Sequence, residues 1–167
     1  MRDLQATAEA LLADLVGFPS VSGTPNGAIV GYIKDYLEKL NIPVRIDAHE
    51  DGERFNLFAI IGPQIDVGIV LSGHTDVVPA NSAGWTGDPF TLRKQDGRLY
   101  GRGAADMKGF LAIALALAPL FKQAEDELRL PLHYAFTFDE EVGSFGAAQM
   151  PAFLQKHQIK PAIAIIG

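Results

Sequence analysis

The chain has 167 residues, of which 48% are hydrophobic and 20% are charged. This composition is typical of one folded domain and excludes a disordered or fibrous chain. The net charge is −6, from 14 Lys and Arg against 20 Asp and Glu, so the chain lacks the positive charge with which proteins bind nucleic acid. Cysteine is absent. His and carboxylates are therefore the available metal ligands, and the cytoplasm is the favoured compartment.

Two helices are expected at the start of the chain. Apolar residues at helical spacing run from Leu4 to Leu15, and Gly17 and Pro19 follow where such a helix should end. The second helix is predicted over residues 26–40. Charged residues interrupt the apolar pattern of the first segment, so we expect no signal peptide there.

Strands and helices then alternate. Short β-rich runs occupy 44–48, 56–61 and 67–72, and Asp96-Gly97 predicts a hairpin turn. An apolar helix is expected from Gly109, and its uncharged core, 110–121, is shorter than the roughly 20 residues of a membrane span. A strand at 130–138, a helix at 145–157 and a strand at 162–166 follow. This alternation predicts one α/β domain with a layered sheet.

The first motif with catalytic character is Ser-Gly-His-Thr-Asp at 72–76, at the end of an apolar strand. Residues two apart in an extended chain point to the same side. The Asp76 carboxylate can therefore accept the His74 N–H and fix the ring tautomer that a metal requires. The alternative is a strand-end histidine paired with an acid and no metal.

A second motif is the turn at 101–109, which contains three glycines and Asp106. Asp106 stands where a dinucleotide-binding turn has its third glycine, and its charge would face a phosphate. The Walker pattern is also absent. Either Asp106 caps the following helix, or the glycines let the backbone approach a ligand closely.

Three consecutive acids, Asp139, Glu140 and Glu141, form the third motif, between a hydrophobic strand and a helix. Adjacent carboxylates repel one another, and a cation offsets that repulsion. A solvated acidic turn is the alternative. Because successive side chains in extended backbone point in opposite directions, one glutamate is expected to bind metal while the other acts as a base.

The three motifs are about thirty residues apart, roughly one strand and one helix, so they can converge at one edge of the sheet. One imidazole with several carboxylates and no sulfur suits zinc, cobalt or manganese in a hydrolytic site. The excess of acids over imidazole indicates two metal ions about 3.5–4 Å apart.

The stretches 71–79, 99–109 and 138–143 resemble the motifs of the zinc-dependent aminoacylases and carboxypeptidases of the M20 family. Within that family, Gly84-Trp85 and 107–110 most resemble the acetylornithine deacetylase branch. The resemblance is strong from Gly68 onward and looser over the first two helices. It implies a zinc exopeptidase-like α/β fold, three-layer αβα with a mostly parallel mixed sheet, here incomplete.

For the site, the resemblance implies that His74, Asp106 and Glu141 bind metal, with Asp106 bridging two zinc ions, for which cobalt is a possible substitute. Asp76 would orient His74, and Glu140 would be the general base. The implied reaction is hydrolysis of an N-acyl amino acid, with N-acetylornithine as the expected substrate, in arginine biosynthesis and with no nucleic-acid or membrane partner. The alternatives are a desuccinylase of succinyl-diaminopimelate, a glutamate-releasing carboxypeptidase, and a non-catalytic binding module.

Members of the family carry a further acidic ligand directly after the strand that here ends at Gly167, and a histidine ligand much later. They also insert a dimerisation domain. The resemblance therefore implies that residues 1–167 are the N-terminal part of a catalytic domain, that the complete protein is a homodimer, and that this chain is inactive alone.

Overall fold

The computed structural model describes residues 2–81 and 83–167, and its main sheet has the strand order β1-β2-β6-β3-β7. Strands β6, β3 and β7 pair in parallel, whereas β2 is antiparallel to both β1 and β6. Four of these five strands therefore run in one direction. Their bounds are Val44–Ala48 for β1, Phe55–Ile61 for β2, Ile69–His74 for β3, Leu132–Thr137 for β6 and Ile163–Ile166 for β7.

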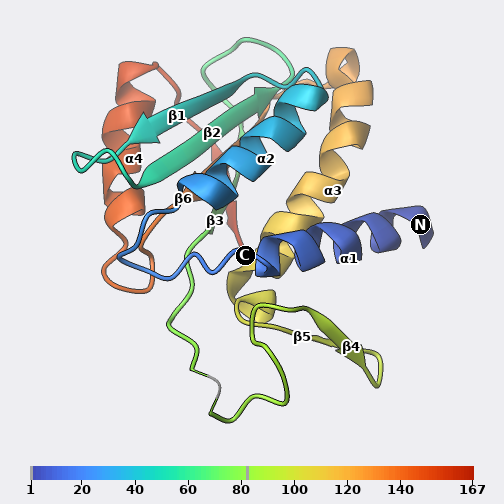
Figure 1. Ribbon diagram of the computed structural model, residues 1–167. Coiled ribbons are helices and arrows are strands. Elements are labelled where there is room, and N and C mark those ends of the chain that lie inside the picture. The colour runs from blue at the N-terminus through green and yellow to red at the C-terminus, as the bar shows by residue number, and fades with distance from the viewer. Residues whose placement is uncertain (1, 82) are drawn as a thin grey trace.

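Helices cover both faces of this sheet (Figure 1). One face packs against α1 (Arg2–Val16), α2 (Gly27–Lys39) and α3 (Gly109–Gln123), and the other against α4 (Phe145–Lys156). Alternate residues of a strand point to opposite faces. In β2, Leu57 accordingly joins the larger core under the first three helices, while Phe58 joins the smaller core under α4. The three-layer αβα fold and its mostly parallel mixed sheet are confirmed.

Helix α3 is the central helix of the larger core. Its side chains Leu111 and Leu115 are fully buried, and the Tyr134 hydroxyl of β6 donates to the Ala114 carbonyl at 3.3 Å. Within the part of the chain that the structure describes, Ala104–Gln123 is the one segment long and apolar enough to cross a membrane. Of its most apolar stretch, 44% is buried inside the protein. Its packing is that of a core helix.

Strand β3 begins and ends two residues later than the sequence predicts. It starts at Ile69, after Gly68, and continues through Gly73 because pairing with β6 extends to His74, which lies opposite Thr137. His74 is therefore the last residue of the strand and is held by the sheet itself.

The hairpin predicted at Asp96-Gly97 joins β4 (Arg93–Gln95) to β5 (Arg98–Tyr100). Both turn residues have positive φ, 50° and 72°, as a tight two-residue hairpin turn requires. The hairpin lies apart from the main sheet (Figure 1).

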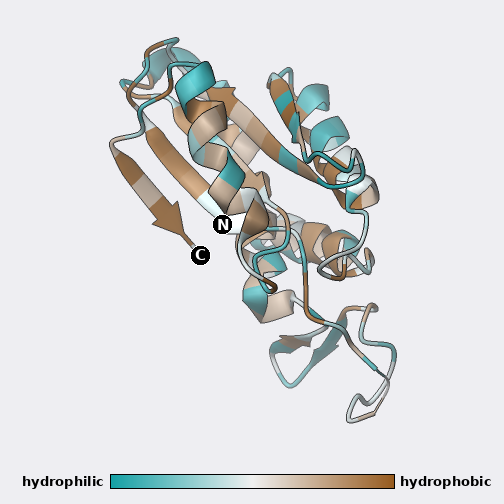
Figure 2. Cartoon of the chain, turned by 90° about the vertical axis from the view of Figure 1, so that its left-hand side faces the viewer, coloured by the Kyte–Doolittle hydropathy of each residue, from teal (hydrophilic) through white to brown (hydrophobic). Residues whose placement is uncertain are grey.

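Strand β7 forms one edge of the main sheet and pairs with β3 alone among the described residues. Its isoleucines at 163, 165 and 166 are 53%, 48% and 74% exposed, and Figure 2 shows the strand as a hydrophobic border of the molecule.

A histidine whose ring forms no hydrogen bond among the described residues is buried in the central strand, β6. His133 is fully buried and neither ring nitrogen has a partner among the described residues. Its ring centroid lies 5.3 Å from that of Phe58, and its Nε2 would lie 2.3 Å from a Cβ placed on Gly68. Burial lowers the pKa of His133 below its ordinary value of 6.5.

This burial predicts a pH dependence of stability. Below pH 6.5 the unfolded chain binds a proton at His133 that the folded chain does not, so the free energy of unfolding falls as the pH falls, by at most about 1.4 kcal/mol per pH unit. Above that pH the contribution is constant. Urea unfolding of the wild type and of His133→Leu between pH 5 and 8 should show a smaller slope for the variant. Equal slopes would contradict the prediction.

Candidate metal centre

His74 lies buried at the carboxyl end of β3. Its Nδ1 faces Asp76, and its Nε2 faces Asp106 and Glu140. Nδ1 is 3.0 Å from the Asp76 carbonyl oxygen and 3.3 Å from its carboxylate. Nε2 is 3.0 Å from Asp106 Oδ1 and 3.8 Å from Glu140 Oε2. When Nδ1 donates its proton to Asp76, Nε2 presents the lone pair that a metal needs.

Asp76 is a buried carboxylate, 2% exposed, that accepts several hydrogen bonds. The Ser22 hydroxyl donates to Oδ2 at 2.7 Å, the Glu140 N–H donates to Oδ1 at 3.0 Å, and the Glu141 N–H donates to Oδ2 at 3.3 Å. Burial alone would raise the pKa of Asp76, but the hydrogen bonds from His74, Ser22 and Glu140 outweigh it and lower this pKa below its ordinary value.

Two neighbouring carboxylates, those of Asp76 and Asp106, determine the charge of the His74 imidazole. Burial lowers the pKa of His74, but the neighbouring Asp76 and then Asp106 more than compensate and raise it to about 9. An imidazole buried here without acidic neighbours would be neutral near pH 7, whereas the surrounding acids favour the protonated, positively charged ring.

The acidic turn after β6 is not extended. Asp139 has a φ of 53°, and the Glu140 carbonyl accepts the Gly143 N–H at 3.2 Å. The side chains of Glu140 and Glu141 consequently both reach His74, with one ligand atom from each of the three residues lying within 4.8 Å of the others. The expectation that the two glutamates point in opposite directions is wrong, because their backbone turns.

Asp106 reaches the same place from the glycine-rich turn. Its Oδ1 contacts His74, its side chain is 75% exposed, and its backbone is extended, with φ −124° and ψ 100°. Helix α3 begins only at Gly109, with Lys108 at the cap position and no side-chain cap. The capping interpretation of Asp106 is therefore wrong.

Asp139, the first acid of the turn, faces away from this cluster. It is 1% exposed and accepts the Gly23 N–H at 2.7 Å and a hydrogen bond from the Arg54 guanidinium. Arg54 also contacts Asp51 at 2.6 Å. The sequence groups Asp139 with the two glutamates, and the backbone turn gives it a separate structural position.

The donor set fits a divalent cation. One ligand atom each from His74, Glu140 and Glu141 lies within 4.8 Å of the others, and Asp106 contacts the same imidazole. The pKa of Glu141 is raised, first by burial and then by the charge of Asp106. A hard or borderline dication offsets such repulsion and accepts nitrogen and oxygen ligands.

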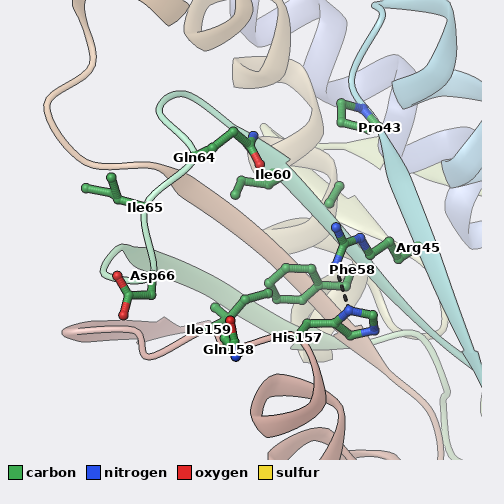
Figure 3. A pocket seen from close by; sticks show the side chains of 11 residues that line it. Pro43, Arg45, Phe58, Ile60, Gln64, Ile65, Asp66, His157, Gln158 and Ile159 are labelled. Atoms are coloured by element: carbon green, nitrogen blue, oxygen red, sulfur yellow. Dashed lines mark hydrogen bonds between the residues drawn. The ribbon is translucent and has the colours of Figure 1, made fainter.

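A separate hollow of about 530 Å³, shown in Figure 3, lies at the end of the sheet opposite to His74. It is lined by Ile60, which pairs with His133 near the start of β6, far along the strand from Thr137 and the acids. Its Arg45 Nη1 is 2.8 Å from His157 Nδ1. The hollow therefore has no part in the centre around His74.

A model of the peptidase family M20/M25/M40 matches residues 70–167, more than half of the chain. The chain belongs to the M20 peptidase family. All three motifs of the centre lie within the matched range.

Among curated proteins, this M20 chain is similar to acetylornithine deacetylases. It is 38% identical over 165 residues to the one from Proteus mirabilis, covering 94% of this chain and 41% of that protein. The Shigella sonnei protein is also 38% identical, over 160 residues, with 92% and 40% covered. The chain thus spans about two fifths of the length of these relatives.

Solved structures show the same fold. Human carnosine dipeptidase 1 superposes with a TM-score of 0.77 at 22% identity, over 99% of this chain and 40% of that chain. An M20 family metallo-carboxypeptidase from Sulfolobus solfataricus gives 0.79 at 24% identity, over 95% and 36%.

Two contacts, one in the centre and one beside it, have no signal in the sequence. Ser22 lies in the loop between α1 and α2, and Arg54 directly precedes β2. They are 54 and 85 residues away from the acids that they contact. No local pattern marks either residue, because a serine in a loop and an arginine beside a turn are common at protein surfaces. Their roles come from the tertiary fold.

The pairing of Asp139 predicts that Arg54→Met is destabilising. The substitution leaves a buried carboxylate without its cation, which costs about 3 kcal/mol in the free energy of unfolding measured in urea. The matched control is Lys34→Met, which removes a pair whose side chains are 38% and 45% exposed and should leave stability unchanged. Equal effects of the two variants would refute a structural role for the Arg54 pair.

Proposed function

We propose that this chain is part of a zinc-dependent amidohydrolase that removes the acetyl group from N-acetylornithine. The observation that supports this most is the convergence of His74, Glu140 and Glu141 within 4.8 Å, with Asp106 in contact with His74. The similarity to acetylornithine deacetylases supports the substrate. Ornithine and acetate are then the products, and arginine biosynthesis in the cytoplasm is the setting.

In this proposal His74, Asp106 and Glu141 are the metal ligands held by this part of the protein. Asp76 keeps the His74 ring in one orientation, since it lies against Nδ1 and is itself fixed by backbone N–H groups. Bound zinc, or cobalt in its place, would polarise the amide carbonyl and lower the pKa of the attacking water.

Glu140 is the proposed general base. Its side chain is 47% exposed and its Oε2 lies 3.8 Å from His74 Nε2, so it borders the metal ligands and remains open to a substrate. It would accept a proton from the attacking water and deliver that proton to the leaving amine.

We further propose that residues 1–167 form the N-terminal part of the catalytic domain, and that the complete protein adds a second acidic ligand, a later histidine and a dimerisation domain. The proposal is supported by the two fifths of each relative that the chain spans. The complete protein would then be a homodimer.

Two substitutions separate the proposed roles of the adjacent glutamates in the complete protein. Glu140→Gln should retain zinc and lower kcat for N-acetylornithine by about 10²-fold or more, because it removes only the base. Glu141→Gln should chiefly weaken zinc retention. Zinc content and deacetylation rates of both variants, with the exposed Glu38→Gln as control, test this. The reverse pattern would exchange the two roles.

The chain of 167 residues is predicted to hydrolyse N-acetylornithine poorly even with added zinc. It offers one metal position a full set of ligands and leaves Asp106 as the protein ligand for a second ion, so transition-state stabilisation is incomplete and the rate should fall by at least about 10²-fold. The assay compares this chain with the complete protein at several zinc concentrations. Turnover within tenfold of the complete protein would contradict the two-metal proposal.

A further inference from the structure

The loop at residues 18–23, between α1 and α2, contacts all three motifs of the metal centre without providing a ligand. The Phe18 carbonyl accepts a hydrogen bond from the buried Lys108 ammonium, in the second motif, at 2.6 Å. At the other end of the loop, the Gly23 N–H donates to Asp139 of the third motif at 2.7 Å. This loop therefore links segments that lie far apart in the sequence.

Between these ends the loop runs along the first motif. The Ser20 hydroxyl donates to the Thr75 carbonyl at 2.6 Å. The Ser22 N–H donates to the Val77 carbonyl, and the Val77 N–H donates to the Ser20 carbonyl, both at 3.0 Å. Backbone pairing on both sides of Asp76 thus holds the loop in register with it.

Ser22 is the loop residue whose side chain reaches the centre. Its Oγ lies 2.7 Å from Asp76 Oδ2 and 3.2 Å from the Val77 carbonyl, and the shorter contact is the charge-assisted one. Asp76 in turn touches His74 Nδ1 and receives the N–H groups of Glu140 and Glu141. One hydroxyl therefore acts on a carboxylate that orients three candidate metal-site residues.

We propose that Ser22 is a positioning residue of the metal centre, which fixes the Asp76 carboxylate in the orientation that aims His74 and the acidic turn at the metal. This inference rests on the proposed metal-dependent function. Without the hydroxyl, Asp76 can rotate toward its remaining donors. The imidazole and the two glutamates are then no longer held in one orientation by the same carboxylate.

The structure provides a matched control in the same loop. Thr24 is exposed, and its hydroxyl donates to the Val21 carbonyl within the loop. Thr24→Ala removes a local hydrogen bond and leaves Asp76 untouched. Ser22→Thr keeps a hydroxyl at position 22, which is half-buried and borders the open Gly23.

The experiment measures zinc affinity by competition with a chromophoric chelator and, separately, the visible absorption of the Co²⁺-loaded protein. Ser22→Ala should weaken zinc binding by about tenfold, the lower end for loss of an outer hydrogen bond at a metal site, and should shift the cobalt bands. Ser22→Thr should restore both to near the wild-type values, and Thr24→Ala should change neither. A urea unfolding curve for each variant establishes that it is folded.

The outcomes are distinguishable. Zinc affinity and cobalt bands of Ser22→Ala equal to those of the wild type would overturn the role of Ser22 while leaving the metal centre intact. A loss of affinity in Ser22→Ala that Ser22→Thr fails to restore would also overturn it. Zinc binding by the wild type that His74→Ala does not weaken would overturn the metal centre itself, and the inference with it.

Discussion

The centre depends on one buried carboxylate. Asp76 binds no metal in the arrangement that we propose, yet it contacts the His74 ring, accepts the Ser22 hydroxyl and receives the N–H groups of both glutamates. A buried charge without such donors would be strongly unfavourable. Because these donors come from three different parts of the chain, the position of this carboxylate is stable only when the strand, the loop and the acidic turn are all in place.

Sheet topology brings these parts together. β3 and β6 are parallel neighbours, so their carboxyl ends lie at the same edge and His74 stands opposite Thr137. The residues that follow each strand, 75–76 and 139–141, must then occupy adjacent space. The glycine-rich turn reaches this edge through Met107, whose sulfur accepts the His74 N–H at 3.2 Å. The three motifs therefore converge because of strand order rather than through any direct sequence proximity.

Much of this was predictable from the sequence, and the exceptions have physical causes. Periodicity and turn residues located the helices and strands, since apolar spacing and Gly and Pro act locally. The predicted strand at 67–72 lies two residues before the observed β3, because pairing with β6 extends the strand through Gly73, which local propensity disfavours. The direction of the glutamate side chains depended on the positive φ of Asp139, and Ser22 and Arg54 depended on contacts over 54 and 85 residues. Such contacts have no local sequence pattern.

The strand order also determines when the centre can form during folding. The β1–β2 hairpin and β3 are complete by residue 74, yet they do not pair with each other, because β6, at Leu132–Thr137, lies between them. The chain therefore extends nearly sixty residues beyond β3 before β6 begins and can pair with both β2 and β3. Pairing over such separations slows folding. Until that strand arrives, Asp76 lacks the backbone donors of the acidic turn. The geometry that we propose for metal binding consequently requires β6, the same strand that joins the two halves of the sheet.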